Sequence, residues 1–575
     1  MLLTLLRRHL RPYRRDVVVV VLLQFVQTLA ALSLPSLNAD IIDKGVVVGD
    51  TGYIMRVGAL MLLISAVQVA CAVSAVYLGA RAATSVGRDL RRAVFTRVQR
   101  FSVAEAGRFG APSLITRSTN DVQQVQMVTL MTFTVIVMAP IMMVGGVVMA
   151  LRQDVGLSAL LLVVVPVLLG LIVVIALRMG PLFKLIQGRI DRINLVMREQ
   201  ISGVRVIRAF NRQPSERQRF GRANSELMGT SLSVGYLMAL MFPAVQVVIN
   251  ASSVAVVWFG AGRIDSGAME VGSLVAFLNY LMQILMSVLM ASMMFMMVPR
   301  AAVSADRIEA VLGTEPAIVA PARPRRLPAG RAVIELDGVS FGYAGAAASV
   351  LHDVSLRLEP GRTTAIIGST GSGKSTLVNL LPRLVDATGG VVRAGGVDVR
   401  EVDPAELRSR VSVVPQRAYL FSGTIASTLR FARPEATDEE LWGALEAAQA
   451  SEFVTGLGLD ARVEQGGSNF SGGQRQRLAI ARALLKPADL YVFDDSFSAL
   501  DYATDARLRA GLPMATAGAA VLIVAQRVAT IREADEIVVL DEGRVVGRGS
   551  HSGLMEDNPT YQEIVLSQLS AQEAA

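Results

Sequence analysis

The stretch with the clearest chemical meaning is a glycine-rich segment at residues 368–376, which reads Gly-Ser-Thr-Gly-Ser-Gly-Lys-Ser-Thr. It follows an apolar, strand-like run and precedes an amphipathic run that begins at Leu377. The spacing G-x-x-x-x-G-K-S predicts a loop whose backbone N–H groups surround phosphate oxygens at the start of a helix. The segment therefore predicts binding of a nucleoside triphosphate. The residues expected to contact it are Gly368, Ser369, Thr370, Gly371, Ser372, Gly373, Lys374, Ser375 and Thr376.

Within this loop, two side chains carry the charge chemistry. Lys374 is placed to neutralise the β- and γ-phosphates, and the Ser375 hydroxyl is placed to hold Mg²⁺. We therefore expect ATP and Mg²⁺ as the cofactors of this site.

Further polar residues stand where apolar, strand-like runs end. Gln416 closes the segment 413–416, Asp494 and Asp495 close the run that begins at residue 490, and Gln526 follows the run 521–525. Ahead of the loop, the ring of Tyr343 is placed to stack on an adenine base. These residues are candidates for a nucleotide pocket.

A second phosphate-seeking element begins at residue 471. Ser471, Gly472, Gly473 and Gln474 open a helical run, and the N–H groups at a helix start attract anions. Asp501 follows further along the chain, after a strand that ends in carboxylates.

Composition separates this soluble-looking half from an apolar half. Of 575 residues, 52% are hydrophobic, and the first 300 or so contain long uncharged runs. A membrane span needs about 20 apolar residues. Cys71 is the single cysteine, so the chain contains no pair for an internal disulfide. Six runs qualify as candidate spans: 17–37, 57–78, 128–151, 157–177, 237–260 and 271–298.

The charge pattern predicts the orientation of these spans. Arginines outnumber acidic residues in the long loops 81–121 and 178–226, whereas the short loops are not basic. Under the positive-inside rule both long loops and both termini are cytoplasmic. Because the net charge of +8 arises between apolar spans, we expect no nucleic-acid partner. The predominance of arginine over lysine favours a GC-rich bacterial genome, and hence the inner membrane.

The two long loops also carry helical periodicity. Spans two to five are therefore expected to continue as helices beyond the bilayer, with short breaks at 108–112 and 210–214. Such tips suit docking onto a soluble domain. The spans hold amides and hydroxyls but almost no ionisable groups, which argues against ion coupling. The last span is rich in methionine, which suits irregular apolar ligands as well as ordinary helix packing.

Taken together, these motifs resemble the ATP-binding cassette (ABC) transporters, and the whole chain is similar to an exporter-type half-transporter. The segments 114–122 and 203–210 are similar to that family's intracellular loops. The resemblance implies a polytopic α-helical membrane domain of six transmembrane helices followed by an α/β P-loop ATPase domain. The expected domains are a transmembrane domain with an N-terminal interfacial helix (1–315), a linker (316–330) and a nucleotide-binding domain (331–575).

The family pattern also assigns roles to the candidate residues. Asp494, Ser375 and Gln416 would hold Mg²⁺, and Gln416, Asp495 and Gln526 would occupy catalytic positions. Two chains would enclose two ATP molecules, each between the P-loop of one chain and the Ser471 segment of the other. Tyr343 and Asp501 would complete the nucleotide contacts.

Two of these positions depart from the family pattern. Asp495 stands where glutamate is usual, and its side chain is shorter by about 1.5 Å. Misplacement by about 1 Å can cost on the order of a hundredfold in rate. Gln526 stands where the family has a histidine, and an amide carries neither a proton nor a positive charge to the phosphate. Both changes predict an ATP site with low intrinsic turnover.

The leading hypothesis is therefore one subunit of a heterodimeric ATP-driven transporter that moves hydrophobic or amphiphilic compounds, drugs or lipids, by alternating access. Its own nucleotide site would be degenerate, and its Ser471 segment would complete the active site of the partner. Membrane lipids and a second half-transporter are the expected partners. Three alternatives stay open: an ATP-gated, non-hydrolysing regulatory or channel-like subunit, a homodimeric lipid flippase, and a siderophore or lipid importer on the same fold.

Overall fold

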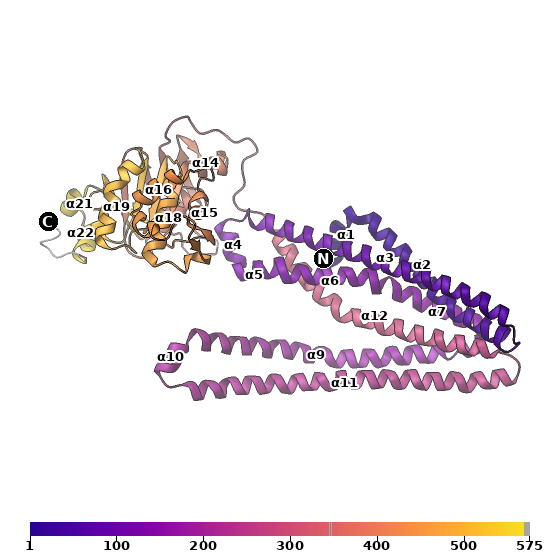
Figure 1. Ribbon diagram of the computed structural model, residues 1–575. Helices are drawn as coiled ribbons and strands as arrows, with labels where there is room; N and C mark the ends of the chain where they lie inside the picture. The colour runs from indigo at the N-terminus through magenta and orange to yellow at the C-terminus, as the bar shows by residue number, and fades with distance from the viewer. Residues whose placement is uncertain (344, 347, 569–575) are drawn as a thin grey trace. The chain divides into compact units, whose positions relative to one another are not determined.

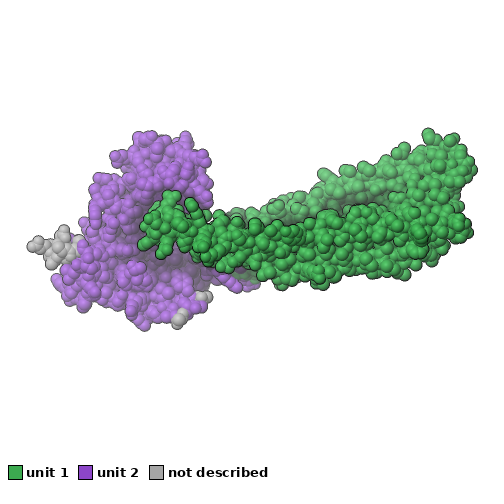
Figure 2. Space-filling model, turned by 90° about the horizontal axis from the view of Figure 1, so that it is seen from below, with its two compact units in different colours: residues 1–99, 111–314 green, residues 100–110, 315–575 purple. Residues whose placement is uncertain are grey.

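The computed structural model describes residues 1–343, 345–346 and 348–568. Contacts divide the chain into two compact units, residues 1–99 with 111–314 and residues 100–110 with 315–575 (Figure 2). The first unit is helical. All strands that the described residues form lie in the second unit.

Long helices build the first unit (Figure 1). Six helical segments of its described residues are long and apolar enough to cross a membrane, as the apolar runs predict. α3, α9 and α11 have 48, 42 and 53 residues, well beyond the roughly 20 that a span needs. The helices are α1 (Leu2–Leu10), α2 (Arg14–Asp40), α3 (Thr51–Val98), α5 (Ala111–Thr116), α6 (Val122–Met131), α7 (Met138–Gln153), α8 (Val155–Ser158), α9 (Leu161–Ser202), α10 (Val204–Ala209), α11 (Gln213–Asp265) and α12 (Val271–Leu312).

One 3₁₀ turn and several π-helical turns interrupt the α-helices of this unit. A 3₁₀ turn (Arg11–Tyr13) precedes α2, and three π-helical segments occur at Ile41–Val46, Arg117–Asp121 and Thr132–Ile136. A π turn inserts an extra residue into the helical repeat and shifts the face that follows. The chain from α5 to α7 therefore stays helical, but the face of the helix that points to its neighbours changes at each π turn.

Two of the long helices, α9 and α11, form a pair. α9 and α11 pack along each other and join at α10, as Figure 1 shows. Gln200 Nε2 donates to the Glu216 carboxylate at 3.2 Å, and Arg219 pairs with Glu199, so polar contacts close the charged half of this pair. The pair contacts the rest of the first unit mainly through α12.

Hydrogen bonds join α2 to α12. The Tyr280 hydroxyl lies 2.8 Å from the Leu32 carbonyl oxygen, to which it donates, and 2.8 Å from the Ser36 hydroxyl. Asp43 accepts a hydrogen bond from the Gly272 N–H at 2.7 Å, which satisfies a free donor at the start of α12. These polar links fix the register of two otherwise apolar helices.

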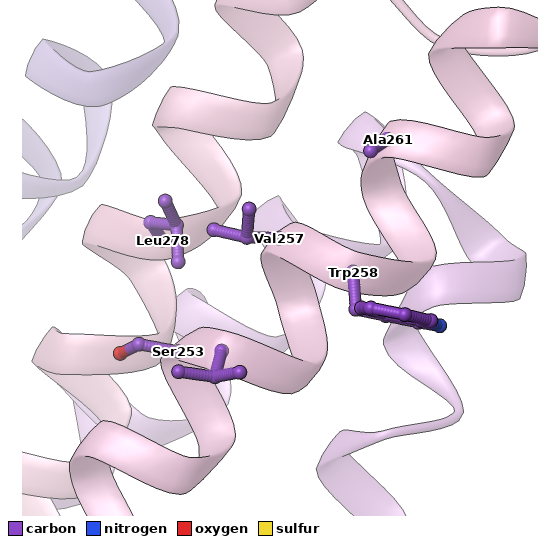
Figure 3. A pocket seen from close by; sticks show the side chains of 6 residues that line it. Ser253, Val257, Trp258, Ala261 and Leu278 are labelled. Carbon is purple, nitrogen blue, oxygen red and sulfur yellow. The ribbon is translucent and has the colours of Figure 1, made fainter.

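An open apolar groove of about 730 Å³ lies between α11 and α12 (Figure 3). Val257 and Leu278 face each other across it, and the Trp258 ring extends outward from α11. The Ser253 hydroxyl also lines the groove, but it already donates to the Ile249 carbonyl oxygen at 3.0 Å. The other lining side chains are mainly apolar, so the groove wall is apolar.

Two main sheets organise the second unit. A six-stranded sheet has the order β12-β11-β3-β10-β9-β6, and a four-stranded antiparallel sheet has the order β2-β1-β4-β5. The larger sheet is parallel except for β12. Its strands are β3 (Thr363–Ile367), β6 (Val411–Val414), β9 (Leu490–Asp494), β10 (Ala520–Val524), β11 (Glu536–Asp541) and β12 (Arg544–Gly549).

The remaining elements of the second unit are the strands of the four-stranded sheet, the two-stranded sheet β7-β8, and the helices. The other strands are β1 (Ile334–Phe341), β2 (Leu351–Leu358), β4 (Gly389–Ala394), β5 (Val397–Asp398), β7 (Gly423–Thr424) and β8 (Arg462–Val463). The helices are α4 (Val103–Phe109), α13 (Lys374–Leu380), α14 (Pro404–Arg410), α15 (Ile425–Arg430), α16 (Asp438–Ala447), α17 (Ser451–Thr455), α18 (Gly472–Leu485), α19 (Tyr502–Ala515), α20 (Val528–Ile531), α21 (His551–Asp557) and α22 (Pro559–Leu566). Short 3₁₀ turns lie at Val399–Glu401 and Gln465–Gly467.

Burial explains why these runs become central strands. Every residue of β9 and of β10 is buried, as a parallel strand covered on both faces requires. The membrane helices and this P-loop α/β unit together confirm the predicted fold class.

Packing at the start of α12 yields a stability prediction. A Cβ at Gly272 would lie 2.4 Å from the Ala39 carbonyl oxygen and 2.5 Å from Asp43 Oδ2. Gly272→Ala must therefore push α2 and α12 apart, with a strain of about 1–3 kcal/mol. We expect a thermal unfolding midpoint several degrees lower in detergent solution.

Gly262→Ala is the matched control, because a Cβ at this helical glycine meets nothing within 4 Å. Equal midpoints for the two variants would contradict the close approach at Gly272.

Candidate nucleotide site

Four strand ends bring the candidate residues together. β3, β10, β9 and β6 are parallel neighbours, with Val524 paired to both Ile366 and Asp494 and with Val414 paired to Phe493. The carboxyl ends of parallel strands lie along one edge of a sheet, which is where such folds bind ligands. The P-loop, the two carboxylates, Gln526 and Gln416 follow these four strands and therefore share this edge.

Backbone geometry in the P-loop requires glycine. Gly371 and Gly373 have φ values of 89° and 99°, a left-handed region that disfavours side chains. A Cβ at Gly368 would lie 1.9 Å from the Leu540 carbonyl oxygen. The chain can therefore fold tightly around a phosphate group only because these positions lack side chains.

Lys374 is the first residue of α13 and turns back over this loop. Its ammonium donates to the carbonyl oxygens of Gly368 at 2.8 Å and Ser369 at 2.7 Å. Burial lowers the pKa of Lys374, and the nearby Asp495 and Asp494 oppose that effect. A phosphate at the loop would supply the partially buried cation with a counter-charge.

The donor set beside the lysine fits Mg²⁺. Ser375 Oγ lies 3.5 Å from Asp494 Oδ1, so a hydroxyl and a carboxylate oxygen converge at the strand end. Burial raises the pKa of Asp494, and the neighbouring Asp495 raises it further. Oxygen ligands of this kind suit Mg²⁺, which usually keeps water and phosphate oxygens as its other ligands.

Asp495 adopts an uncommon backbone conformation and receives two hydrogen bonds. Its φ is 47°, in the left-handed region, where Asp is among the more tolerated residues. Gln416 Nε2 and Gln526 Nε2 both donate to Asp495 Oδ2, each at 3.1 Å. Two amides therefore occupy one oxygen of the carboxylate that follows Asp494.

Tyr343 lies next to the P-loop helix. Its hydroxyl is 3.2 Å from Thr376 Oγ1, and its ring meets Phe341 edge-on with centroids 4.9 Å apart. About half of the Tyr343 surface is exposed, so this side chain is accessible to a ligand.

The Ser471 segment forms a helix start with a capping box. Ser471 N–H donates to Gln474 Oε1 at 3.0 Å, and Gln474 N–H donates to Ser471 Oγ at 3.3 Å. Gly472 and Gly473 are the first two residues of α18, and a Cβ at Gly472 would meet nothing within 4 Å. This helix start is exposed and can accept an anion from outside the unit.

Asp501 has a structural contact of its own. It caps α19 by accepting a hydrogen bond from the Thr504 N–H at 2.9 Å, and this bond holds the pKa of Asp501 below its usual range. Asp501 therefore orders the loop that joins β9 to α19.

Sequence reasoning missed two residues near this edge. Arg527 donates to the Ser498 carbonyl oxygen at 3.1 Å, and Gln568 forms hydrogen bonds to the backbone around Arg527. Gln568 follows a short helix far along the chain from the P-loop, and no local motif marks it.

Comparisons with known proteins agree with this architecture. The ABC transporter transmembrane region family matches residues 17–288, and the ABC transporter family of ATP-binding domains matches residues 351–498. An uncharacterized ABC transporter ATP-binding protein of Mycobacterium tuberculosis is 53% identical over 99% of this chain and 98% of its own length. The chain belongs to the ABC transporter family, with transmembrane and ATP-binding domains fused, and it is a multi-pass membrane protein.

More distant relatives carry functional names. The fatty acid ABC transporter ATP-binding/permease protein of M. tuberculosis is 33% identical over 78% of this chain and 71% of its own length. The ATP-dependent lipid A-core flippase of Coxiella burnetii is 29% identical over 93% of this chain and 91% of its own length. A bacterial Atm1-family ABC exporter with ATP bound has the same fold, with a TM-score of 0.80 and 23% identity over 98% of this chain and 100% of that one.

The P-loop geometry predicts a selective loss of nucleotide binding. At Gly373 a Cβ would lie 2.7 Å from Leu351 Cδ2, in addition to the left-handed strain. Gly373→Ala should therefore displace the loop and weaken ATP binding at least about tenfold, because misplaced donors lose their hydrogen bonds to phosphate. Equilibrium binding of a fluorescent ATP analogue measures the change.

The control is Gly396→Ala, at a turn between β4 and β5. Gly396 also has a positive φ, 79°, but a Cβ there meets nothing within 4 Å. We expect Gly396→Ala to cost about 1 kcal/mol of stability while ATP affinity is unchanged. If both variants bind ATP like the parent chain, the P-loop is not the nucleotide site.

Proposed function

We propose that this chain is one subunit of a heterodimeric ABC exporter that moves hydrophobic or amphiphilic compounds, lipids included, across the bacterial inner membrane. Both termini would lie in the cytoplasm. Its own nucleotide site would bind ATP and hydrolyse it slowly, and its Ser471 segment would complete the faster site of the partner. The observation that carries this proposal is the pairing of Asp495 with Gln416 and Gln526.

The geometry at Asp495 supports slow hydrolysis. The attacking water needs a carboxylate that reaches it and a group that stabilises charge on the terminal phosphate. Asp495 is a methylene shorter than glutamate, and one of its oxygens already accepts two amide hydrogen bonds. Gln526 can donate a hydrogen bond to a phosphate oxygen but brings no charge.

The same residues suit ATP retention. Mg²⁺, when bound, would neutralise the β- and γ-phosphates. Ser375 and Asp494 would hold that ion, the P-loop N–H groups and Lys374 would hold the phosphates, and Tyr343 would hold the base. None of these binding interactions requires a proton to be transferred, whereas hydrolysis does. The site would therefore act as an ATP-dependent clamp.

The position of the Ser471 segment supports a second chain. Its helix start is exposed, and it belongs to the same compact unit as the P-loop. In the resemblance to ABC exporters the two elements face each other only across a dimer. A partner's nucleotide would therefore bind at Gly472 and Gly473, and ATP binding would draw the two chains together.

Two exposed apolar surfaces suit the coupling of ATP binding to transport. α10 exposes Val206, and the adjoining Phe210 is 73% exposed. The second unit exposes an aromatic group formed by Tyr419, Phe421 and Phe431, whose rings lie about 5 Å apart. Docking of one chain's loop tip on the other chain's aromatic group would transmit closure to the membrane helices.

The membrane unit supports an apolar or amphiphilic cargo. Met282, Met286 and Met290 recur at intervals of four along α12 and are each partly exposed. Flexible thioether side chains accommodate irregular apolar surfaces. The lipid and fatty acid names of two relatives support the same substrate class.

Restoring the usual residues should raise turnover at this chain's own site. Asp495→Glu together with Gln526→His supplies the missing reach and a titratable ring. In the co-purified complex we expect ATPase activity to increase at least about tenfold at this site, since misplacement of such groups costs on the order of a hundredfold. Steady-state phosphate release measures the effect.

The two single substitutions serve as controls and should each give a smaller increase. Unchanged turnover in all three variants would mean that this site is not degenerate. Full activity from a single kind of polypeptide, purified from native membranes, would contradict the heterodimer.

A substitution at the signature segment tests the partner site. Gly472→Glu places a carboxylate at the exposed helix start, where an added Cβ would meet nothing within 4 Å. The fold is preserved, and the added charge repels the phosphate of a nucleotide bound opposite. We expect the activity of the complex to fall at least about tenfold, because a helix start and its donors stabilise transferring phosphate.

The matched control is Gly443→Ala in α16, which also has open space around its Cβ. If Gly472→Glu leaves turnover unchanged, the segment does not complete an active site. If Asp495→Glu with Gln526→His then recovers activity in the Gly472→Glu background, the recovered turnover belongs to this chain's own P-loop.

A further inference from the structure

A glutamine after α22 binds the segment that carries Gln526. Gln568 Nε2 donates to the Gln526 carbonyl oxygen at 2.7 Å, and Gln568 Oε1 accepts from the Val528 N–H at 2.9 Å. One carboxamide therefore joins the backbone on both sides of Arg527. Such a two-point contact fixes orientation as well as position.

The base of this contact is rigid. Tyr561 and Val565 of α22 are fully buried in the same apolar core as Val528 and Ile531 of α20. The Tyr561 hydroxyl lies 2.7 Å from His551 Nδ1, which ties α22 to α21. We call residues 526–528 the switch segment. Gln568 thus follows a packed helix whose core includes Val528 of this segment.

The segment that Gln568 holds reaches two parts of the nucleotide site. The Gln526 side chain donates to Asp495 at 3.1 Å. Arg527 donates to the Ser498 carbonyl oxygen at 3.1 Å and lies over the Tyr502 ring, 5.3 Å from its centroid. A shift of the backbone at 526–528 would therefore move the amide beside Asp495 and the loop before α19 together.

We propose that Gln568 is a positioning residue that holds the Gln526 amide toward the terminal phosphate and thereby sets the preference of this site for ATP over ADP. This inference rests on the proposed ATP site. Gln568 touches the backbone of the switch segment rather than the nucleotide. Its removal should let Gln526 turn away, which costs a phosphate contact that only ATP offers.

A purely structural role makes a different prediction. If Gln568 only completes the end of α22, its loss would lower stability and weaken ATP and ADP binding alike. Selective loss of ATP affinity separates the two cases, because the two nucleotides share every contact except those to the γ-phosphate.

The test measures dissociation constants of Mg²⁺-ATP and Mg²⁺-ADP on the full-length protein in its co-purified complex. A complex carrying Lys374→Ala identifies the signal that belongs to this chain's site. With Gln568→Ala we expect the ratio of ATP to ADP affinity to fall about fivefold, since one hydrogen bond to a charged group is lost. Gln568→Glu keeps the acceptor for the Val528 N–H and loses the donor to the Gln526 carbonyl oxygen. Its ratio of ATP to ADP affinity should therefore lie between those of the parent chain and of Gln568→Ala.

The matched control is Gln562→Ala. Gln562 lies within α22, the helix that precedes Gln568, and donates to the Met555 carbonyl oxygen at 2.7 Å, away from the switch segment. The proposal is overturned if Gln568→Ala leaves the ratio unchanged, or if Gln562→Ala changes it equally. Because this test reads binding in the native site and the earlier test reads turnover after Asp495→Glu with Gln526→His, either proposal can fail without the other.

Discussion

The alignment of four parallel strands is the constraint on which the nucleotide site depends. β3, β10, β9 and β6 end at one edge, and their central members are buried along their whole length. A central strand that slipped by one residue would exchange the side chains on its two buried faces and carry its terminal residue away from the edge. The apolar core of the sheet thereby sets the positions of polar groups that it never touches.

At that edge, binding and turnover make different demands on the protein. Phosphate binding uses backbone N–H groups and a lysine, whose positions follow from glycines with positive φ and from the start of α13. Turnover needs side chains placed to within about 1 Å of their productive positions around a reacting water. Asp495 and Gln526 hydrogen-bond each other at this second set of positions, and this contact is the basis of the proposed slow turnover.

The membrane unit follows a separate logic. Its helices expose apolar side chains that suit lipid, and hydrogen bonds join α2, α7 and α12 where these three helices meet. Gln153 donates to the Ser36 hydroxyl there, next to the Tyr280 hydroxyl. Hydrogen bonds of this kind specify which helices meet, a choice that uniformly apolar surfaces leave open.

Much of this protein could be predicted from local sequence. Apolar runs of sufficient length predicted six spans, and the P-loop spacing predicted a phosphate site, because both depend on residues adjacent in the chain. Only tertiary structure decided that Gln416 and Gln526 donate to the same oxygen of Asp495, and that Gln568 holds Gln526 from 42 residues away. Strand order and helix packing create those contacts, and no periodicity along the chain encodes which distant backbone groups will meet.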